Sequence, residues 1–123
     1  MKKSIMTNKA PMPAGSYSQA ILTENLVFVA GQGPLDPATK TVPTTVSEQT
    51  RQVLTNIKNI LLEAGSSMDK VVKVSVFLSD IKYFNEFNKV YEEFFNEPFP
   101  VRTTVGAQLN NIDVEIDVIA LKN

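Results

Sequence analysis

The stretch that decides the fold is residues 45–78, which read TVSEQTRQVLTNIKNILLEAGSSMDKVVKVSVFL. From Val46 onward, apolar side chains recur at spacings of three and four residues, which predicts one long amphipathic helix. Thr45, followed three residues later by Glu48, forms the capping-box pattern that starts a helix. Gly65 stands where a left-handed residue commonly ends one.

The last eight residues of the same stretch predict a β-strand. Val71 to Leu78 is rich in β-branched side chains that alternate along the chain. We expect one strand face to carry Val72, Val74, Val76 and Leu78, and the other to carry Val71, Lys73, Ser75 and Phe77. The helix is therefore expected to connect to a strand that can bury one side.

Upstream of this unit, two further strands are predicted. Residues 16–22 and 26–30 are separated by the turn residues Thr23-Glu24-Asn25, so we expect them to pair as a hairpin. The loop that follows, residues 34–44, holds three prolines.

Downstream, a second helix is predicted over about 83–96, with Asp80 as a candidate cap and Pro98 and Pro100 beyond its end. Two closing strands, 102–109 and 113–121, are expected to form a hairpin at Asn110-Asn111, because asparagine tolerates left-handed backbone.

The predicted order β-β-α-β-α-β-β over residues 1–123 indicates a single α+β domain with both helices on one face of a sheet. The other sheet face is then uncovered. It carries the apolar side chains Phe77, Ile119 and Leu121 beside the charged side chains Lys73, Glu115 and Asp117. Because a half-apolar exposed sheet face usually packs against another subunit, we expect an oligomer.

The absence of cysteine and histidine limits the chemistry. It excludes Cys/His zinc sites, thiol nucleophiles, disulfides and triads with a histidine base. The sequence also lacks a tight cluster of carboxylates that could bind Mg²⁺, so we expect a site without metal or cofactor. A net charge of −1 without clustered Lys or Arg argues against nucleic acid. The sequence has no apolar segment long enough to span a membrane, and we expect a cytoplasmic protein.

Arg102 is the first candidate site residue. It opens a strand directly after Pro98-Phe99-Pro100, and its planar fork can bind a carboxylate with two hydrogen bonds. A surface salt bridge is the competing interpretation. Glu115 shares a strand face with Asp117, where it either faces solvent or activates water.

The other candidates are less specific. Gly31-Gln32-Gly33 follows a strand, but Pro34 precludes the helix that a dinucleotide-binding glycine motif needs. The motif forms a turn or permits close approach of the backbone to a ligand. Tyr17 and Asn88 either belong to the core or line a site.

Taken together, these residues resemble the Rid family, the reactive-imine deaminases also called the YjgF family. The resemblance covers nearly the whole chain. It rests on the following residues: Ala10-Pro11, Gly15–Ala20, Ala30–Gln32, Pro34–Pro37, Gln49-Thr50, Asn56, Leu62–Gly65, Val72-Lys73, Val76–Leu78, Asp80, Phe84, Asn88, Tyr91, Phe94-Phe95, Arg102–Gly106, Val114–Asp117 and Ile119-Ala120. It implies a chorismate-mutase-like mixed sheet and a homotrimer with ligand sites in clefts between subunits.

The resemblance also implies residue roles. Arg102 matches the family arginine that grips the substrate carboxylate, and Glu115 matches the glutamate that positions water. Ala30 and Gly31 match backbone contacts, while Tyr17 and Asn88 match positions that line the cleft. The implied substrate is a 2-imino acid, such as 2-iminobutanoate, 2-iminopropanoate or its enamine 2-aminoacrylate, hydrolysed to a 2-oxo acid and ammonia as a form of metabolite damage control.

Two alternatives remain open. The same cleft could hold a carboxylate metabolite without turnover, as a regulatory binding module. Ribonuclease activity, also described for family members, fits poorly with near-neutral charge and no histidine. Many members have other residues where this chain has Ser16, Ala30 and Gly33, and the changes at Ala30 and Gly33 bear on substrate preference.

If 102–109 and 113–121 form a hairpin, Arg102 lies roughly 20 Å from Glu115 along it, at about 3.3 Å per residue. We therefore expect any site that uses both residues to draw them from different subunits.

Overall fold

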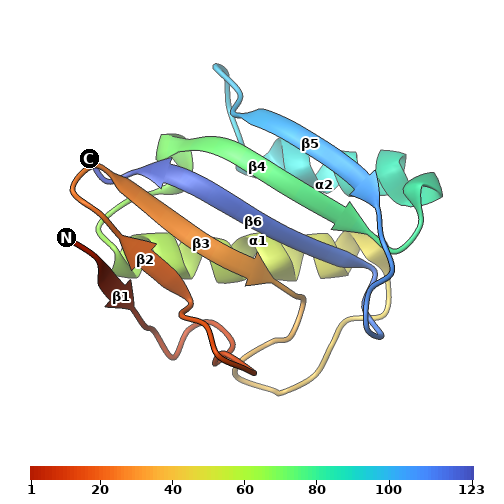
Figure 1. Cartoon of the computed structure of the whole chain (residues 1–123). Helices are drawn as coiled ribbons and strands as arrows, with labels where there is room; N and C mark the ends of the chain where they lie inside the picture. Colours follow the sequence, from red (N-terminus) through yellow and green to blue (C-terminus); the bar gives the residue numbers. More distant parts are fainter.

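The computed structural model describes residues 1–123 as one mixed sheet of six strands with two α-helices. The strands, in the sheet order β1-β2-β3-β6-β4-β5, are β1 Lys3–Ile5, β2 Ala20–Leu22, β3 Leu26–Gln32, β6 Val114–Leu121, β4 Val71–Leu78 and β5 Val101–Gly106. The helices are α1 Val46–Glu63 and α2 Phe84–Phe94, with short 3-10 turns at Met68–Lys70 and Ile81–Tyr83. Figure 1 shows both helices behind the sheet, so the α+β class and the one-sided helix packing are confirmed.

Helix α1 forms as its sequence predicts. The Thr45 side chain accepts a hydrogen bond from the Glu48 backbone N–H at 3.1 Å, which satisfies one free donor of the first turn. Gly65 follows the helix with φ 81°, the left-handed conformation expected after a helix end. The apolar stripe of α1, including Val53, Leu54, Ile57, Ile60 and Leu61, is fully buried against the sheet.

Strand β6 occupies the centre of the sheet, antiparallel to both β3 and β4. Its inward side chains Val114, Ile116, Val118 and Ala120 are almost completely buried beneath the helices. Because β3 and β4 both run antiparallel to β6, they are parallel to each other, and α1 makes the crossover between them. Strands β4 and β5 are also parallel, and α2 makes the crossover between these two.

The predicted closing hairpin is wrong. β5 pairs only with β4, while β6 lies on the far side of β4, so the segment 107–113 carries the chain across β4 instead of turning back on itself. The burial explains the difference: β6 buries every second residue and belongs at the sheet centre, whereas no residue of β5 is fully buried. β5 therefore forms an edge.

Smaller corrections concern the N-terminal region and β4. The predicted strand 16–22 is regular only over 20–22, where it pairs with β3 as expected, and β1 was not predicted. Helix α2 spans 84–94 and is therefore shorter than the predicted 83–96, mainly at its C-terminal end; Asp80 caps the preceding 3-10 turn by accepting from the Lys82 N–H. Val72 is exposed because a register shift between Val71 and Lys73 interrupts the alternation there.

The face of the sheet away from the helices is uncovered in this chain and is called the open face here. As the sequence predicts, it carries alternate residues of β6 together with the residue of β4 that pairs with the first of them: Glu115, Asp117, Ile119, Leu121 and Phe77. Phe28 and Leu121 expose 40% and 43% of their surface there. Large apolar side chains are thus left in contact with solvent on this face.

Candidate functional site

The guanidinium of Arg102 lies between strand β5 and helix α2. Its central carbon is 4.6 Å from the ring centroid of Tyr91, 5.3 Å from that of Phe84 and 5.7 Å from that of Phe87. Its Nη1 donates a 2.7 Å hydrogen bond to Oδ1 of Asn88. The aromatic faces attract the cation without neutralising it.

No carboxylate forms an ion pair with Arg102. The chain contains two ion pairs, Arg51 with Glu93 and Lys82 with Asp80. Burial raises the pKa of the Tyr91 hydroxyl, an effect that the positive charge of Arg102 only partly opposes. Tyr91 therefore stays neutral at neutral pH and is no counter-ion. Arg102 keeps an uncompensated positive charge.

A cavity of about 350 Å³ opens beside this charge. It is lined by Asn88, Tyr91, Glu92, Phe99, Pro100 and Arg102, and is called the Arg102 pocket here. One hydroxyl of the lining, Tyr91 Oη, is buried without a hydrogen-bond partner. The pocket has the size and the free donors to hold a small carboxylate.

A second group of predicted residues lies where β3 meets β6. The register between these strands shifts between Val29 and Gln32, so Ala30 and Gly31 form a bulge opposite Asp117. The Glu115 carboxylate packs against this bulge: a Cβ placed on Gly31 would lie 2.7 Å from Glu115 Oε2. The absence of a side chain at position 31 is what allows Glu115 its position.

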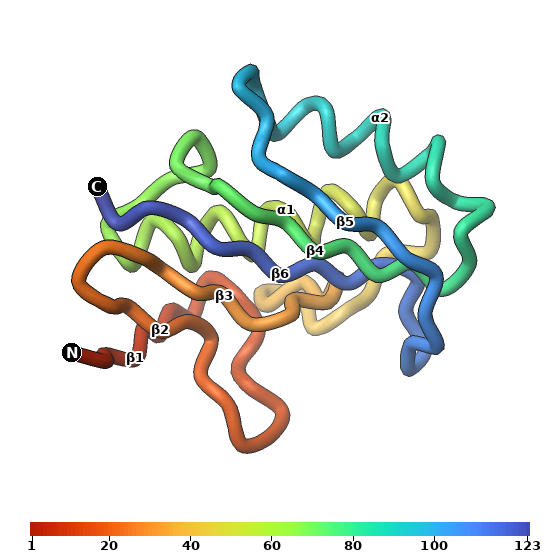
Figure 2. The backbone as a smooth tube through the Cα atoms, turned by 45° about the horizontal axis from the view of Figure 1, so that its top comes forward, coloured from red at the N-terminus to blue at the C-terminus, as the bar shows by residue number.

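Tyr17 lies apart from the Arg102 group, whereas the backbone two residues after it adjoins the second group, since Gln19 O accepts a 2.9 Å hydrogen bond from the Ala30 N–H. Tyr17 itself lies in the segment between β1 and β2, half exposed, and its hydroxyl accepts a 3.1 Å hydrogen bond from the Ala14 N–H. In Figure 2 this segment lies near one edge of the sheet, and β5 forms the opposite edge. Four strand-to-strand steps separate β2 from β5, about 19 Å at 4.8 Å each.

The structure thus brings Arg102 and Asn88 together, and Gly31 and Glu115 together, but does not join the two groups. Arg102 pairs in register with Val74, whose side chain is buried on the helix side, and it contacts α2. Glu115 pairs with Phe77 on the open face. Their side chains leave the sheet on opposite faces, so they do not meet within one chain. The separation along a hairpin that the sequence suggested is not the reason, because β5 and β6 form no hairpin.

The sequence interpretation missed part of the Arg102 pocket. The sequence alone gives no site role to Tyr91, Glu92 or Phe99, which all line the pocket. The i, i+3, i+4 spacing of Asn88, Tyr91 and Glu92 on one helix was a usable signal, because such residues share a face. Nowhere in the structure do three or more potential metal-ligating side chains gather. No helix is both long and apolar enough to cross a membrane.

The fold and site define a small α+β protein with a cavity beside an arginine at a sheet edge. A family model described as Endoribonuclease L-PSP matches residues 7–122. The chain therefore belongs to the Rid family, also called the YjgF or RutC family, and the resemblance drawn from the sequence is confirmed.

Three relatives illustrate the range of the family. Protein MMF1, mitochondrial, of Saccharomyces cerevisiae is 48% identical over 120 residues, covering 96% of this chain and 83% of the yeast protein. The 2-iminobutanoate/2-iminopropanoate deaminase of Bos taurus is 42% identical over 125 residues, covering 99% and 91%. The crystal structure of E. coli TdcF with bound serine superposes with a TM-score of 0.92 at 33% identity, covering 98% and 99%.

The name of the yeast relative places that protein in mitochondria, so a cytoplasmic location for this chain stays a prediction.

Proposed function

We propose that this protein hydrolyses 2-imino acids and their enamine tautomers, including 2-iminobutanoate, 2-iminopropanoate and 2-aminoacrylate, to 2-oxo acids and ammonia. The observation that carries the proposal is the uncompensated Arg102 at the edge of a cavity of about 350 Å³. The bovine relative named as such a deaminase supports the choice of substrate.

Arg102 binds the substrate carboxylate. Only one of its five N–H donors is used within the chain, in the bond to Asn88, so the fork has donors left for two carboxylate oxygens. The three aromatic rings around the guanidinium exclude water from its sides, which strengthens the attraction for an anion.

The chemistry then needs little more than positioning. Water adds to the imine carbon to give a carbinolamine, the C–N bond breaks, and ammonia leaves while the carbon–oxygen double bond forms. Glu115 accepts a proton from the attacking water and passes it to the imine nitrogen, and then carries the hydroxyl proton of the carbinolamine to the departing nitrogen, so that both water protons end on ammonia. The backbone at Ala30 and Gly31 orients the C=N end of the substrate, and Tyr17 closes the cleft.

This site requires a second chain, because Arg102 and Glu115 project from opposite faces of one sheet. We propose a homotrimer in which the open face of each chain packs against its neighbours and brings Glu115 of one chain toward Arg102 of another. The exposed apolar side chains of the open face support this assembly, since burial of Phe28, Val105 and Leu121 would be favourable.

A non-catalytic carboxylate-binding module is the alternative. It is favoured by the fact that the Arg102 pocket is formed within one chain without Glu115. The TdcF structure with bound serine shows that a relative holds an amino acid, which is compatible with either function.

The test is an imine hydrolysis assay. An amino-acid oxidase or a serine/threonine dehydratase generates the imine, semicarbazide traps what remains, and wild type is compared with Arg102→Ala. We expect wild type to outcompete the trap and Arg102→Ala to fail. A wild type that does not accelerate hydrolysis, yet binds 2-oxo acids through Arg102, would support the binding module instead.

A further inference from the structure

We propose that Glu92 is a positioning residue for the anion grip of Arg102 and acts through Asn88. The two hydrogen bonds that carry the inference run in series: Arg102 Nη1 donates to Asn88 Oδ1 at 2.7 Å, and Asn88 Nδ2 donates to Glu92 Oε1 at 3.0 Å. The inference rests on the proposed function, because it concerns the same pocket and the same bound carboxylate.

Asn88 holds the guanidinium by its single side-chain hydrogen bond. The aromatic rings of Phe84, Phe87 and Tyr91 attract the cation but accept a range of orientations within their faces. A hydrogen bond to a carbonyl oxygen is directional. The direction in which the remaining N–H donors of Arg102 point is therefore set by Asn88.

The amide of Asn88 has two possible orientations, because a rotation of its side chain exchanges the oxygen and the NH₂ group. In one orientation the oxygen accepts from Arg102, and in the other two donors face each other, which is repulsive. Glu92 selects the first orientation, since its carboxylate accepts from Nδ2 and leaves the oxygen toward Arg102.

The three glutamates of α2 differ in what they contact. Glu86 accepts hydrogen bonds from the N–H and the hydroxyl of Ser47, and Glu93 pairs with Arg51 on α1. Glu92 alone lines the Arg102 pocket, yet it forms no ion pair with Arg102. Its four-residue spacing from Asn88 puts both side chains on one side of the helix. The arrangement supplies an acceptor for Asn88 while leaving the arginine charge free.

Two substitutions separate the acceptor from the charge. Glu92→Leu removes both, whereas Glu92→Gln keeps an amide oxygen at the same distance along the side chain and removes only the charge. Glu63→Leu is the matched control, because Glu63 is an exposed helical glutamate at the end of α1 with no hydrogen bond or ion pair. Each variant is tested for imine hydrolysis and, by calorimetry, for binding of 2-oxobutanoate, a product-type carboxylate that does not react.

We expect Glu92→Leu to raise KM and the Kd of 2-oxobutanoate about fivefold, with kcat within about twofold of wild type. Glu92→Gln should bind at least as tightly as wild type, because it retains the acceptor and removes a negative charge near the bound anion. Glu63→Leu should match wild type in both measurements.

The inference is overturned if Glu92→Leu leaves Kd unchanged, or if Glu92→Gln weakens binding as much as Glu92→Leu does. It is also overturned if wild type does not bind 2-oxobutanoate. A wild type that binds 2-oxobutanoate but hydrolyses no imine removes the proposed function alone, and the Kd values of the variants still decide the role of Glu92.

Discussion

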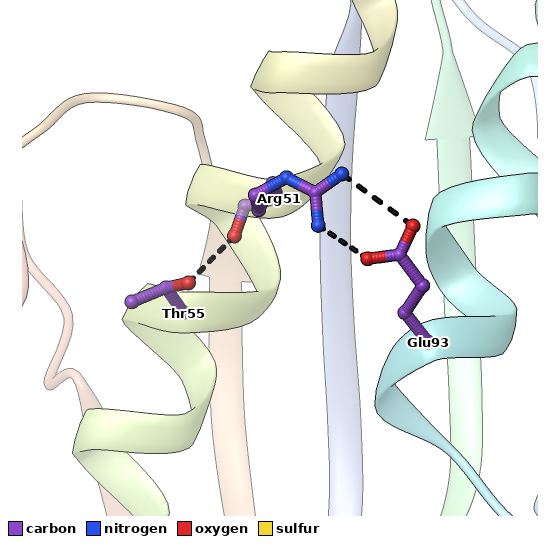
Figure 3. Close-up of polar contacts among 3 residues, drawn as sticks. All are labelled: Arg51, Thr55 and Glu93. Atoms are coloured by element: carbon purple, nitrogen blue, oxygen red, sulfur yellow. Dashed lines mark hydrogen bonds and ion pairs between the residues drawn. The ribbon is translucent and has the colours of Figure 1, made fainter.

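The two arginines of this chain contact different sides of helix α2 and differ in what balances their charge. Arg51 projects from α1 to the Glu93 carboxylate, as Figure 3 shows, and both side chains are about half exposed. Arg102 projects from β5 toward Asn88 and Tyr91, with aromatic rings around it and no carboxylate paired with it. At 3.6 residues per turn, Glu93 points roughly opposite to Tyr91 on the helix.

The difference indicates which arginine is available to a ligand. The pKa of Glu93 is lowered by its hydrogen bond from Arg51, and the pKa of Arg51 is raised by the same contact, so this pair satisfies itself. The Arg102 charge has no such partner inside the chain. Under the proposed function, a small carboxylate complements this charge and Glu115 of another chain supplies the catalytic group.

The largest expected effect follows removal of the unpaired charge. Arg102→Ala should lower kcat/KM for imine hydrolysis by a factor on the order of 10²–10³, as expected when one partner of a desolvated charge pair is removed. The folding free energy should fall by only about 1–2 kcal/mol, from lost packing against the rings. The imine assay and thermal unfolding measure the two effects. A collapse of stability with binding intact per folded molecule would contradict the comparison.

Arg102→Lys sharpens the comparison by keeping the charge and removing the fork. Lysine binds a carboxylate as a point charge, and it loses the hydrogen-bond geometry that Asn88 and two carboxylate oxygens require. We expect an approximately tenfold rise in KM, measured in the same assay. Full retention of KM would mean that only the charge matters.

Gly31→Ala tests the second group of site residues, in which Gly31 contacts Glu115 on the open face. The proposed reaction uses this group together with Arg102, although the two do not touch within one chain. The added Cβ would lie 2.7 Å from Glu115 Oε2, so the carboxylate has to move. We expect kcat to fall roughly threefold to tenfold with a smaller change in KM, as for a misplaced base.

Gly106→Ala is the control, because the nearest atom to its Cβ is Ile81 N at 3.6 Å, an ordinary contact distance. Equal losses in both glycine variants would show that Gly31 has no special relation to Glu115.

The smallest effect belongs to the paired arginine. Because the pKa of Glu93 is lowered in the folded chain, the pair stabilises the protein above the unfolded pKa of a glutamate, about 4.3, and loses this contribution as pH falls through the lowered value. Glu93→Gln should therefore be slightly less stable than wild type near neutral pH and equal to it in acid. Thermal unfolding at both pH values measures the difference, and kcat/KM should not change. A clear loss of activity would mean that both arginines serve the site.

Much of the fold could be predicted because strong periodic patterns have local causes. The α1 cap at Thr45, the end at Gly65 and the strand Val71–Leu78 all appear where the sequence places them. Strand pairing was harder, because it depends on which strand buries the most surface. The short segment between β5 and β6 suggested a hairpin, whereas burial puts β6 between β3 and β4.

The candidate site divides in the same way. The family resemblance assigned Arg102 and Asn88 to the same cleft without predicting a contact, and the structure joins them by a hydrogen bond. The role of Glu92 could not be anticipated, because an exposed helical glutamate has no distinguishing pattern until its partner is known. The sequence did not reveal that Arg102 and Glu115 lie on opposite sheet faces. The face of each residue depends on its pairing with β4, where Arg102 aligns with Val74 and Glu115 with Phe77.

The central claim, that Arg102 of one chain works with Glu115 of another, is tested most directly by mixing two inactive variants. Arg102→Ala and Glu115→Gln chains are unfolded together, reassembled in equal amounts and assayed against each variant alone. If each site takes the two residues from different chains, about one quarter of the sites regain both, and activity returns to about that fraction of wild type. Activity no higher than that of the separate variants, in assemblies shown to contain both chains, would contradict the account.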